Sequence, residues 1–151
     1  MASVVSDSRD ASYVRYAMLV DKFGRRKRRK PVYELQTFYG QLQHIYLLKL
    51  PPSCSRDLKV DSNGTEDTTV ILAGIRSYKL DEGENVTLAD AGLDFQFYTT
   101  TGGFDVVDIT SVQALVGRVQ SLENTRQWVI IDRSGTLARA VFADDDDQSN
   151  D

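Results

Sequence analysis

Six consecutive basic residues, Arg25 to Lys30, carry the clearest chemical signal in this chain. Cationic side chains that neutralise phosphates release counterions, so a flexible basic arm binds nucleic acid without sequence preference, at about 10⁻⁴–10⁻⁶ M. The same pattern is typical of a nuclear-import stretch. A solvated linker without a partner is the third interpretation, because such a run cannot be buried. The residues of the predicted nucleic-acid or import arm are Lys22, Arg25, Arg26, Lys27, Arg28, Arg29 and Lys30.

The charge of the remaining chain confines contact with nucleic acid to this arm. The 151 residues include 18 basic and 22 acidic residues, for a net charge of −4. Without the seven arm residues, 11 basic residues face all 22 acidic ones, a net charge of −11. Since an acidic body repels phosphates, we do not expect it to bind nucleic acid over its whole face.

Aromatic residues form the second candidate site. An aromatic cage can hold a methylated lysine through cation–π contact worth about 0.5–2 kcal/mol, and an acidic body attracts a cationic peptide. Alternation along strands places about half of such residues in the core, so core packing is the competing interpretation. The possible peptide-binding face consists of Tyr39, Tyr46, Tyr78, Tyr98 and Trp128.

No group of residues forms a catalytic or metal-binding motif. His44 and Cys54 are the only histidine and cysteine, which excludes an internal disulfide and zinc sites rich in these residues. Asp105 and Asp108 would face opposite sides of a regular strand, and Asp132 has no carboxylate near it in sequence. The sequence therefore predicts no enzyme, no cofactor and no metal site. It also predicts neither a signal peptide nor a membrane span, because charges interrupt residues 1–20.

Apolar periodicity predicts a mainly β fold. A short helix is expected over 13–23 from the three- and four-residue spacing of its apolar residues. Gly102-Gly103 is expected to be a turn, and no long amphipathic helix is indicated. These features favour a small, partly open antiparallel β-barrel with a short N-terminal helix and disordered ends. The predicted strands cover 37–50, 68–80, 93–99, 104–109, 114–120 and 127–132.

The predicted organisation has four parts. Residues 1–12 form a disordered N-terminus, 13–30 the short helix and basic arm, 31–143 the barrel domain, and 144–151 an acidic disordered tail. The predicted barrel core consists of Ile71, Ile75, Phe97, Val116, Val119, Val129 and Ile131.

Four segments carry a family resemblance: YELQTFYGQLQHIYLL, TTVILAGIRSYKL, FDVVDITSVQALVGRV and QWVIIDRSG. They resemble a C-terminal β-module of transposon-derived open reading frames in basidiomycete fungi, where it follows a transposase-like body. The module is similar in plan to the small β-domain after plant transposases, and more loosely to bromo-adjacent-homology chromatin modules. The resemblance covers roughly residues 13–143 and implies a context in mobile-element or nuclear biology, without a role for any single residue.

The expected function is therefore non-catalytic binding. The leading hypothesis is an accessory module of a transposon-derived nuclear protein, with weak nucleic-acid contact or nuclear import through the basic arm. The alternatives are a chromatin-type peptide reader that uses the barrel face, and a degenerate element-derived fragment without a selected function. The expected partners are nucleic acid, a basic peptide or the rest of a transposase-like protein, and not a membrane. The expected location is nuclear, with cytoplasmic as the alternative.

Overall fold

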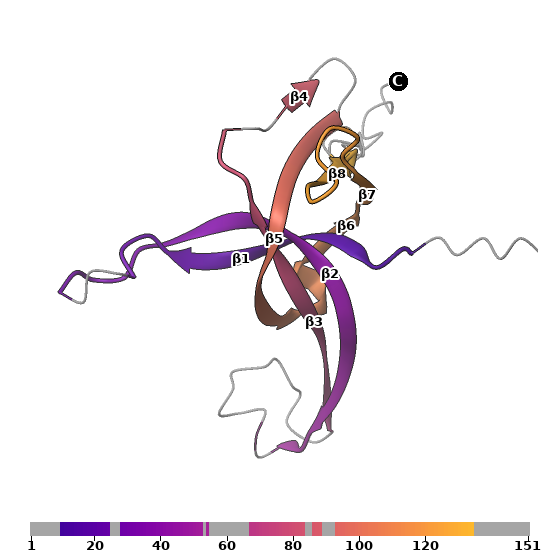
Figure 1. The fold of residues 1–151 in the computed structure, drawn as a ribbon. Helices are drawn as coiled ribbons and strands as arrows, with labels where there is room; N and C mark the ends of the chain where they lie inside the picture. Colours follow the sequence, from indigo (N-terminus) through magenta and orange to yellow (C-terminus); the bar gives the residue numbers. More distant parts are fainter. Residues whose placement is uncertain are drawn as a thin grey trace, which may run out of the picture.

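The computed structural model describes residues 10–24, 28–52, 54, 67–83, 86–88 and 93–134. Within these ranges the chain is mainly β (Figure 1). Runs rich in Val, Ile, Tyr, Phe and Thr form the longest strands, because such side chains pack well on a pleated sheet. The elements in chain order are β1 (Tyr13–Asp21), β2 (Tyr33–Leu50), β3 (Thr68–Leu80), β4 (Val86–Leu88), β5 (Leu93–Asp108), the 3₁₀ turn η2 (Ile109–Ser111), β6 (Val112–Leu115), β7 (Gly117–Gln120) and β8 (Trp128–Asp132).

All strand pairs are antiparallel and belong to one sheet with the order β6-β1-β2-β3-β5-β8-β7, in which β4 also pairs with β5. The sheet is not closed into a barrel. Its two end strands, β6 and β7, are separated in the chain only by Val116, whose N–H donates to the carbonyl oxygen of Tyr13 at 2.9 Å. The antiparallel architecture predicted from the sequence is thus confirmed, but hydrogen bonding stops between the two ends.

The helix predicted over 13–23 is wrong, since Tyr13–Asp21 is strand β1 and pairs along its whole length with β2. Val14 and Tyr16 are buried on one face of this strand. Apolar residues on the opposite face, such as Ala17 and Leu19, hide the two-residue period and imitate helical spacing. The basic run therefore follows a strand of the sheet itself.

Two long hairpins project from the central sheet in different directions (Figure 1). The first, which we call the basic ribbon, pairs Ala17–Asp21 with Tyr33–Thr37; β6 reaches only Tyr16 of β1, and β3 pairs with β2 only from Gly40 onward. The second, the apolar hairpin, pairs His44–Leu50 with Thr68–Gly74. Both strands of each hairpin are thus long continuations of sheet strands beyond the core.

The predicted turn at Gly102-Gly103 lies inside the continuous strand β5. Arg76 pairs with Phe104 and Tyr78 with Thr101, so both glycines face Ser77 in a bulge. The hydroxyl of Ser77 donates to the carbonyl oxygen of Gly103 at 3.0 Å, and a Cβ on Gly102 would lie 2.5 Å from that hydroxyl. Glycine is needed here because a side chain of β3 occupies the space.

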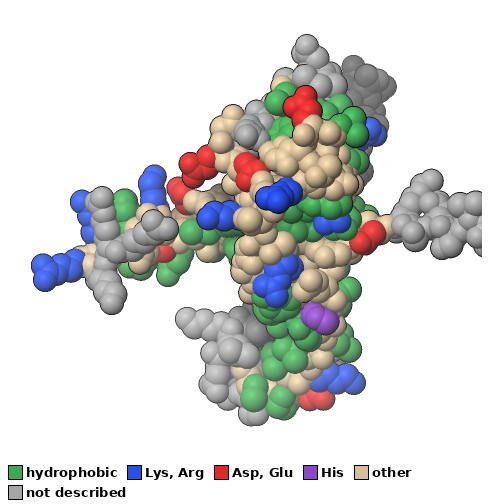
Figure 2. All heavy atoms as spheres, in the orientation of Figure 1, with side chains coloured by type: hydrophobic (Ala, Val, Ile, Leu, Met, Phe, Trp, Pro, Cys, Tyr) green, Lys and Arg blue, Asp and Glu red, His purple; other side chains and the backbone are tan. Residues whose placement is uncertain are grey.

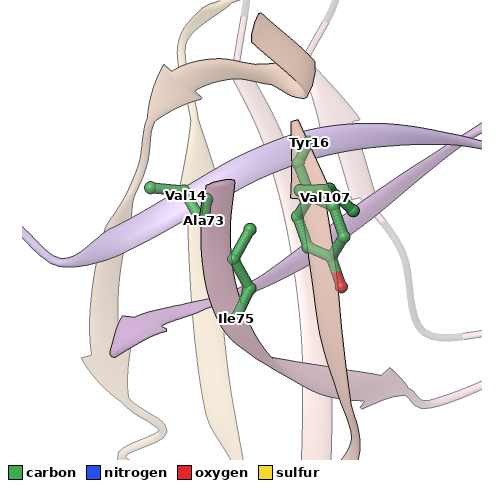
Figure 3. Packing of buried hydrophobic residues seen from close by; sticks show 5 residues of the cluster. All are labelled: Val14, Tyr16, Ala73, Ile75 and Val107. Carbon is green, nitrogen blue, oxygen red and sulfur yellow. The ribbon is translucent and has the colours of Figure 1, made fainter. Parts of the chain in front are cut away.

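The core consists of two clusters. Val14, Tyr16, Ala73, Ile75 and Val107 from β1, β3 and β5 form the first (Figure 3). Tyr39, Tyr78, Tyr98 and Ile130 form the second, with Tyr13, Leu80, Val116 and Trp128 packed against it. Three of the four residues buried in the second cluster are tyrosines, so this part of the core contains buried phenol hydroxyls.

The predicted core is only partly confirmed. Ile75 is fully buried, whereas Ile71 and Val119 are exposed. In β8 the buried residues are Ile130 and Asp132, and not the predicted Val129 and Ile131, which are half-buried together with Phe97 and Val116. The apolar run from Val129 to Ile131 contains no alternation that would show which face is buried. If Asp132 faced solvent, Val129 and Ile131 would face the core instead of Ile130.

Candidate functional site

The basic ribbon carries the described residues of the predicted arm. Lys22 follows β1 directly, and Arg28, Arg29 and Lys30 precede β2, so all four lie at the ribbon tip. Arg28 and Lys30 are exposed. Arg25, Arg26 and Lys27 lie outside the described residues. Blue side chains accordingly gather at the far end of this projection (Figure 2).

The Asp21 side chain joins the two strands at the ribbon tip. Its Oδ1 accepts hydrogen bonds from the backbone N–H groups of Phe23 and Val32, both at 3.0 Å. The N–H of Lys22 also donates to the carbonyl oxygen of Val32 at 2.8 Å. The guanidinium of Arg29 lies over the Phe23 ring, 5.3 Å from its centroid. These contacts attach the described residues Lys22 and Arg29 to the end of a paired ribbon.

One face of the ribbon contains a mixed-charge hollow. It has a volume of about 550 Å³ and is lined by Val20, Asp21, Lys22, Phe23, Gly24, Glu34 and Gln36. Lys22 and Glu34 form an ion pair with an Nζ–Oε2 distance of 3.8 Å. Because carboxylates line this hollow, it does not suit a phosphate group, and the exposed cations Arg28 and Lys30 are better placed for one.

The structure brings together four of the five predicted cage residues, since Tyr39, Tyr78 and Tyr98 are buried in one cluster and Trp128 packs against it. A cation of the chain itself contacts this cluster. Tyr78 and Tyr98 stack with a centroid distance of 4.0 Å. The guanidinium of Arg118 lies 3.9 Å from the Trp128 centroid and 4.4 Å from that of Tyr13, and Arg118 Nη1 donates to the Tyr98 hydroxyl at 3.1 Å. The cluster of Tyr13, Tyr78, Tyr98, Trp128 and Arg118 is therefore an aromatic site already filled by a guanidinium.

Sequence reasoning missed Tyr13 and Arg118 in this cluster. Tyr13 falls in the segment whose spacing predicts a helix. Arg118 lies in the predicted strand 114–120, which forms a hairpin with β8 in which Arg118 pairs with Ile130 and Gln120 with Trp128. Residues two apart on paired strands share a face, so this register brings Arg118 next to Trp128. The register of this hairpin was thus the feature that could have revealed the Arg118–Trp128 contact, but the sequence does not determine that register without the turn geometry.

Tyr39 belongs to the same buried cluster as Tyr78 and Tyr98 but directs its hydroxyl to another partner, and Tyr46 lies outside the cluster. The Tyr39 hydroxyl donates to Oδ2 of the buried Asp132 at 2.7 Å. Tyr46 is on the apolar hairpin, 5.8 Å from the ring of His44, and it is exposed. The five predicted residues do not form one continuous face.

Asp132 connects β8 to β1 and β2 through a buried polar network. Only 1% of it is exposed. Its Oδ1 accepts from both the backbone N–H and the hydroxyl of Ser134, at 2.8 and 2.5 Å, and its Oδ2 accepts from Arg15 Nη1 at 3.3 Å. Burial by itself raises the pKa of Asp132, but the hydrogen bonds from Ser134 and Tyr39 and the charge of Arg15 together hold that pKa below its ordinary value. This carboxylate has structural partners on all sides.

The other two aspartates considered for a metal site have separate partners. Asp105 accepts a hydrogen bond from the Tyr16 hydroxyl at 2.7 Å, and Asp108 caps η2 by accepting from the N–H of Thr110 at 2.8 Å. Within the described ranges, no three His, Cys, Asp or Glu side chains gather as a metal ion would require. No helix in this part of the chain has the length and apolar character needed to cross a bilayer. The chain matches no protein-family model, no curated protein and no solved structure.

Proposed function

We propose that this protein is a non-catalytic module that contacts the phosphate backbone of nucleic acid through the tip of the basic ribbon. The observation that carries the proposal is the position of Lys22, Arg28, Arg29 and Lys30 at the end of a projecting two-stranded ribbon. The role suggested by the resemblance, an accessory module of a transposon-derived nuclear protein, is part of the same proposal.

The shape of the ribbon supports this role. Its two-stranded part contains five residue pairs, from Ala17↔Thr37 to Asp21↔Tyr33, which span roughly 17 Å. A two-stranded ribbon fits the major groove of duplex DNA, which is about 12 Å wide. Projection also separates the cations from the acidic body, and this separation lowers the repulsion between body and phosphates.

A peptide reader is the second candidate, and the aromatic cluster is the reason to retain it. The cluster holds a guanidinium, so its geometry suits a cation. That guanidinium is Arg118, held by two rings and the Tyr98 hydroxyl. A cationic ligand would have to displace it and break these contacts, so we rank this function below nucleic-acid contact.

The test compares two double variants that remove the same charge. Arg28→Ala/Lys30→Ala changes the ribbon tip, and Lys79→Ala/Arg126→Ala changes two exposed cations of the body. Binding to two labelled duplexes of unrelated sequence is measured by fluorescence anisotropy between 25 and 200 mM salt. The ribbon variant should bind both duplexes more weakly. In a plot of the logarithm of its binding constant against the logarithm of the salt concentration, the magnitude of the slope should fall by up to about 0.9 for each phosphate that it no longer neutralises. The body variant should keep the wild-type slope.

Three results would count against the proposal. Equal reductions of affinity in both variants would mean that net charge, and not the ribbon, determines binding. No binding at low salt, with loss of nuclear accumulation in the ribbon variant, would leave the arm as an import signal only. Binding of a trimethyl-lysine peptide, detected by a change in Trp128 fluorescence, would place the reader first.

A further inference from the structure

Among the described strands, the outer half of β2 has one hydrogen-bonding edge without a partner, which we call the free edge. Beyond Leu42, whose N–H donates to the carbonyl oxygen of Ser12 at 2.8 Å, β2 pairs on one side with β3. No strand of the described ranges pairs with its other side from His44 to Leu50. Such an edge presents unpaired N–H and C=O groups that template pairing with another strand.

This edge is apolar and uncharged over most of its length. The segment from His44 to Leu48 contains no Asp, Glu, Lys or Arg, and Lys49 is the only residue of these four types on the free edge. Ile45, Tyr46, Leu47 and Leu48 are all exposed, and green side chains cover much of this projection (Figure 2). Exposed apolar side chains along a free edge mark an interaction surface.

We infer that the partner is a second copy of this chain, bound by antiparallel pairing of the two His44–Leu50 edges about a two-fold axis at Leu47. In this register Leu47 faces Leu47, Tyr46 faces Leu48, and Ile45 faces Lys49 of the other copy. All these pairs are apolar or include the aliphatic stem of a lysine. A two-fold axis makes each contact occur twice, as in most homodimers.

Charge complementarity supports a copy as the occupant. Asp10 lies at the inner end of the same edge, where Gln41 Nε2 contacts its Oδ2 at 3.5 Å. In the paired register, Lys49 of each copy lies opposite Ile45 of the other, four residues of strand, or roughly 13 Å, from the Gln41 that contacts Asp10. Within one copy, eight residues of strand separate Gln41 from Lys49, or roughly 26 Å, so pairing about halves the distance along the strand between these opposite charges.

The basic ribbon serves as the contrasting case. It too is two-stranded with exposed leucines, Leu19 and Leu35. Its tip concentrates basic residues, and like charges would repel a second copy.

The outer apolar hairpin has only two strands, a number that is marginal in water, and pairing with a copy extends it to four.

The first test measures mass as a function of concentration by analytical ultracentrifugation of the full chain. Wild type should show a concentration-dependent dimer. Ile45→Thr/Leu47→Thr should weaken dimerisation at least tenfold. The control Leu19→Thr/Leu35→Thr should dimerise like wild type, because its residues lie on the basic ribbon. It is matched in exposure, since Leu19 and Leu35 are 68% and 67% exposed and Ile45 and Leu47 are 63% and 62% exposed.

The second test exchanges charges. Lys49→Glu and Asp10→Lys should each weaken the homodimer, because each places like charges together twice. A mixture of the two variants should form heterodimers, because both contacts then have opposite charges. Leu47→Cys in a Cys54→Ser background should form an intermolecular disulfide across the axis when a thiol oxidant such as diamide is added.

The inference is overturned by a wild-type chain that stays monomeric at millimolar concentration, or by a dimer that Leu19→Thr/Leu35→Thr disrupts and Ile45→Thr/Leu47→Thr does not. A mixture of the charge variants that stays monomeric while wild type dimerises would overturn the proposed register.

Discussion

At the scale of single residues, the polar side chains with the most partners have structural roles. Asp132 joins three strands, and Arg118 fills the aromatic cluster. Burial raises the pKa values of Tyr39 and Tyr78 above their ordinary value. The hydroxyl of Tyr78 has no hydrogen-bond partner within the described part of the chain. Such a group is costly unless the surrounding packing compensates, and here the stacked ring of Tyr98 supplies that packing.

Asp132→Asn should destabilise the fold in a pH-dependent manner. The folded-state pKa of Asp132 is depressed, so its contribution is fully present above the unfolded value of about 3.9 and is lost as pH falls through the folded pKa. The expected decrease in stability at pH 7 is about 1.5–3 kcal/mol, as for hydrogen bonds to a charged group. Urea denaturation at pH 7 and at pH 3 measures it. The difference in free energy of unfolding between wild type and Asp132→Asn should be smaller at pH 3 than at pH 7. The control Glu82→Gln, in an exposed turn, should leave the free energy of unfolding unchanged at both pH values.

Arg118→Met should cost about 0.5–2 kcal/mol, because it removes cation–π contact with two rings while keeping most of the aliphatic stem. Trp128 is the only tryptophan, so its fluorescence reports both unfolding and the local change. Arg126→Met, in the exposed turn of the same hairpin, is the matched control. Equal stability of the two variants would mean that the cluster contributes packing without a cation–π component.

At the scale of elements, the register of β8 determines which of its residues form the core. Tyr98 pairs with Trp128, and Gln96 with Ile130. This register places Ile130 among Tyr39, Tyr78 and Tyr98 and leaves Ile131 half-buried on the other face. Two adjacent, chemically identical side chains thus differ only in the face that they occupy.

Ile130→Ala should therefore cost about 2–5 kcal/mol, the usual range for truncating a buried isoleucine. Ile131→Ala should cost less than half as much, since this side chain is only half-buried. Thermal denaturation of both variants provides the comparison. If Ile131→Ala were the more damaging, β8 would have the opposite face inward.

At the scale of the whole molecule, our two proposals assign different partners to the two hairpins according to their charge. The proposed partner of the basic ribbon is a polyanion, and that of the apolar hairpin is a second copy of the chain. Both project from a body that is acidic overall, which has a net charge of −11 without the seven arm residues. A dimer through the apolar hairpin would have two basic ribbons.

If both proposals hold, the dimer should bind long duplexes by avidity. Wild type should bind a duplex of about 60 base pairs on the order of 10²-fold more tightly than one of about 15, provided that the spacing allows both ribbons to bind. Ile45→Thr/Leu47→Thr should lose this advantage and bind the short duplex like wild type, because its ribbons are unchanged. Anisotropy titrations at fixed low salt measure both affinities. If the variant still preferred the long duplex as strongly as wild type does, tight binding to long duplexes would not depend on dimerisation.

The sequence alone determined the β class and most strand positions, because β-branched and aromatic runs between Gly and Pro signals are local features. It also determined the charge split between the arm and the body. Tertiary structure decided the secondary structure of 13–21, since only pairing with β2 distinguishes a two-sided apolar strand from a helix. It also decided the inward face of β8, because a buried carboxylate requires Arg15, Tyr39 and Ser134, and the first two lie on distant strands. The aromatic cluster depends on the same long-range registers. Tyr13, Tyr78, Tyr98 and Trp128 come from β1, β3, β5 and β8, which meet only after β2 has paired with both β1 and β3, and their cation comes from β7.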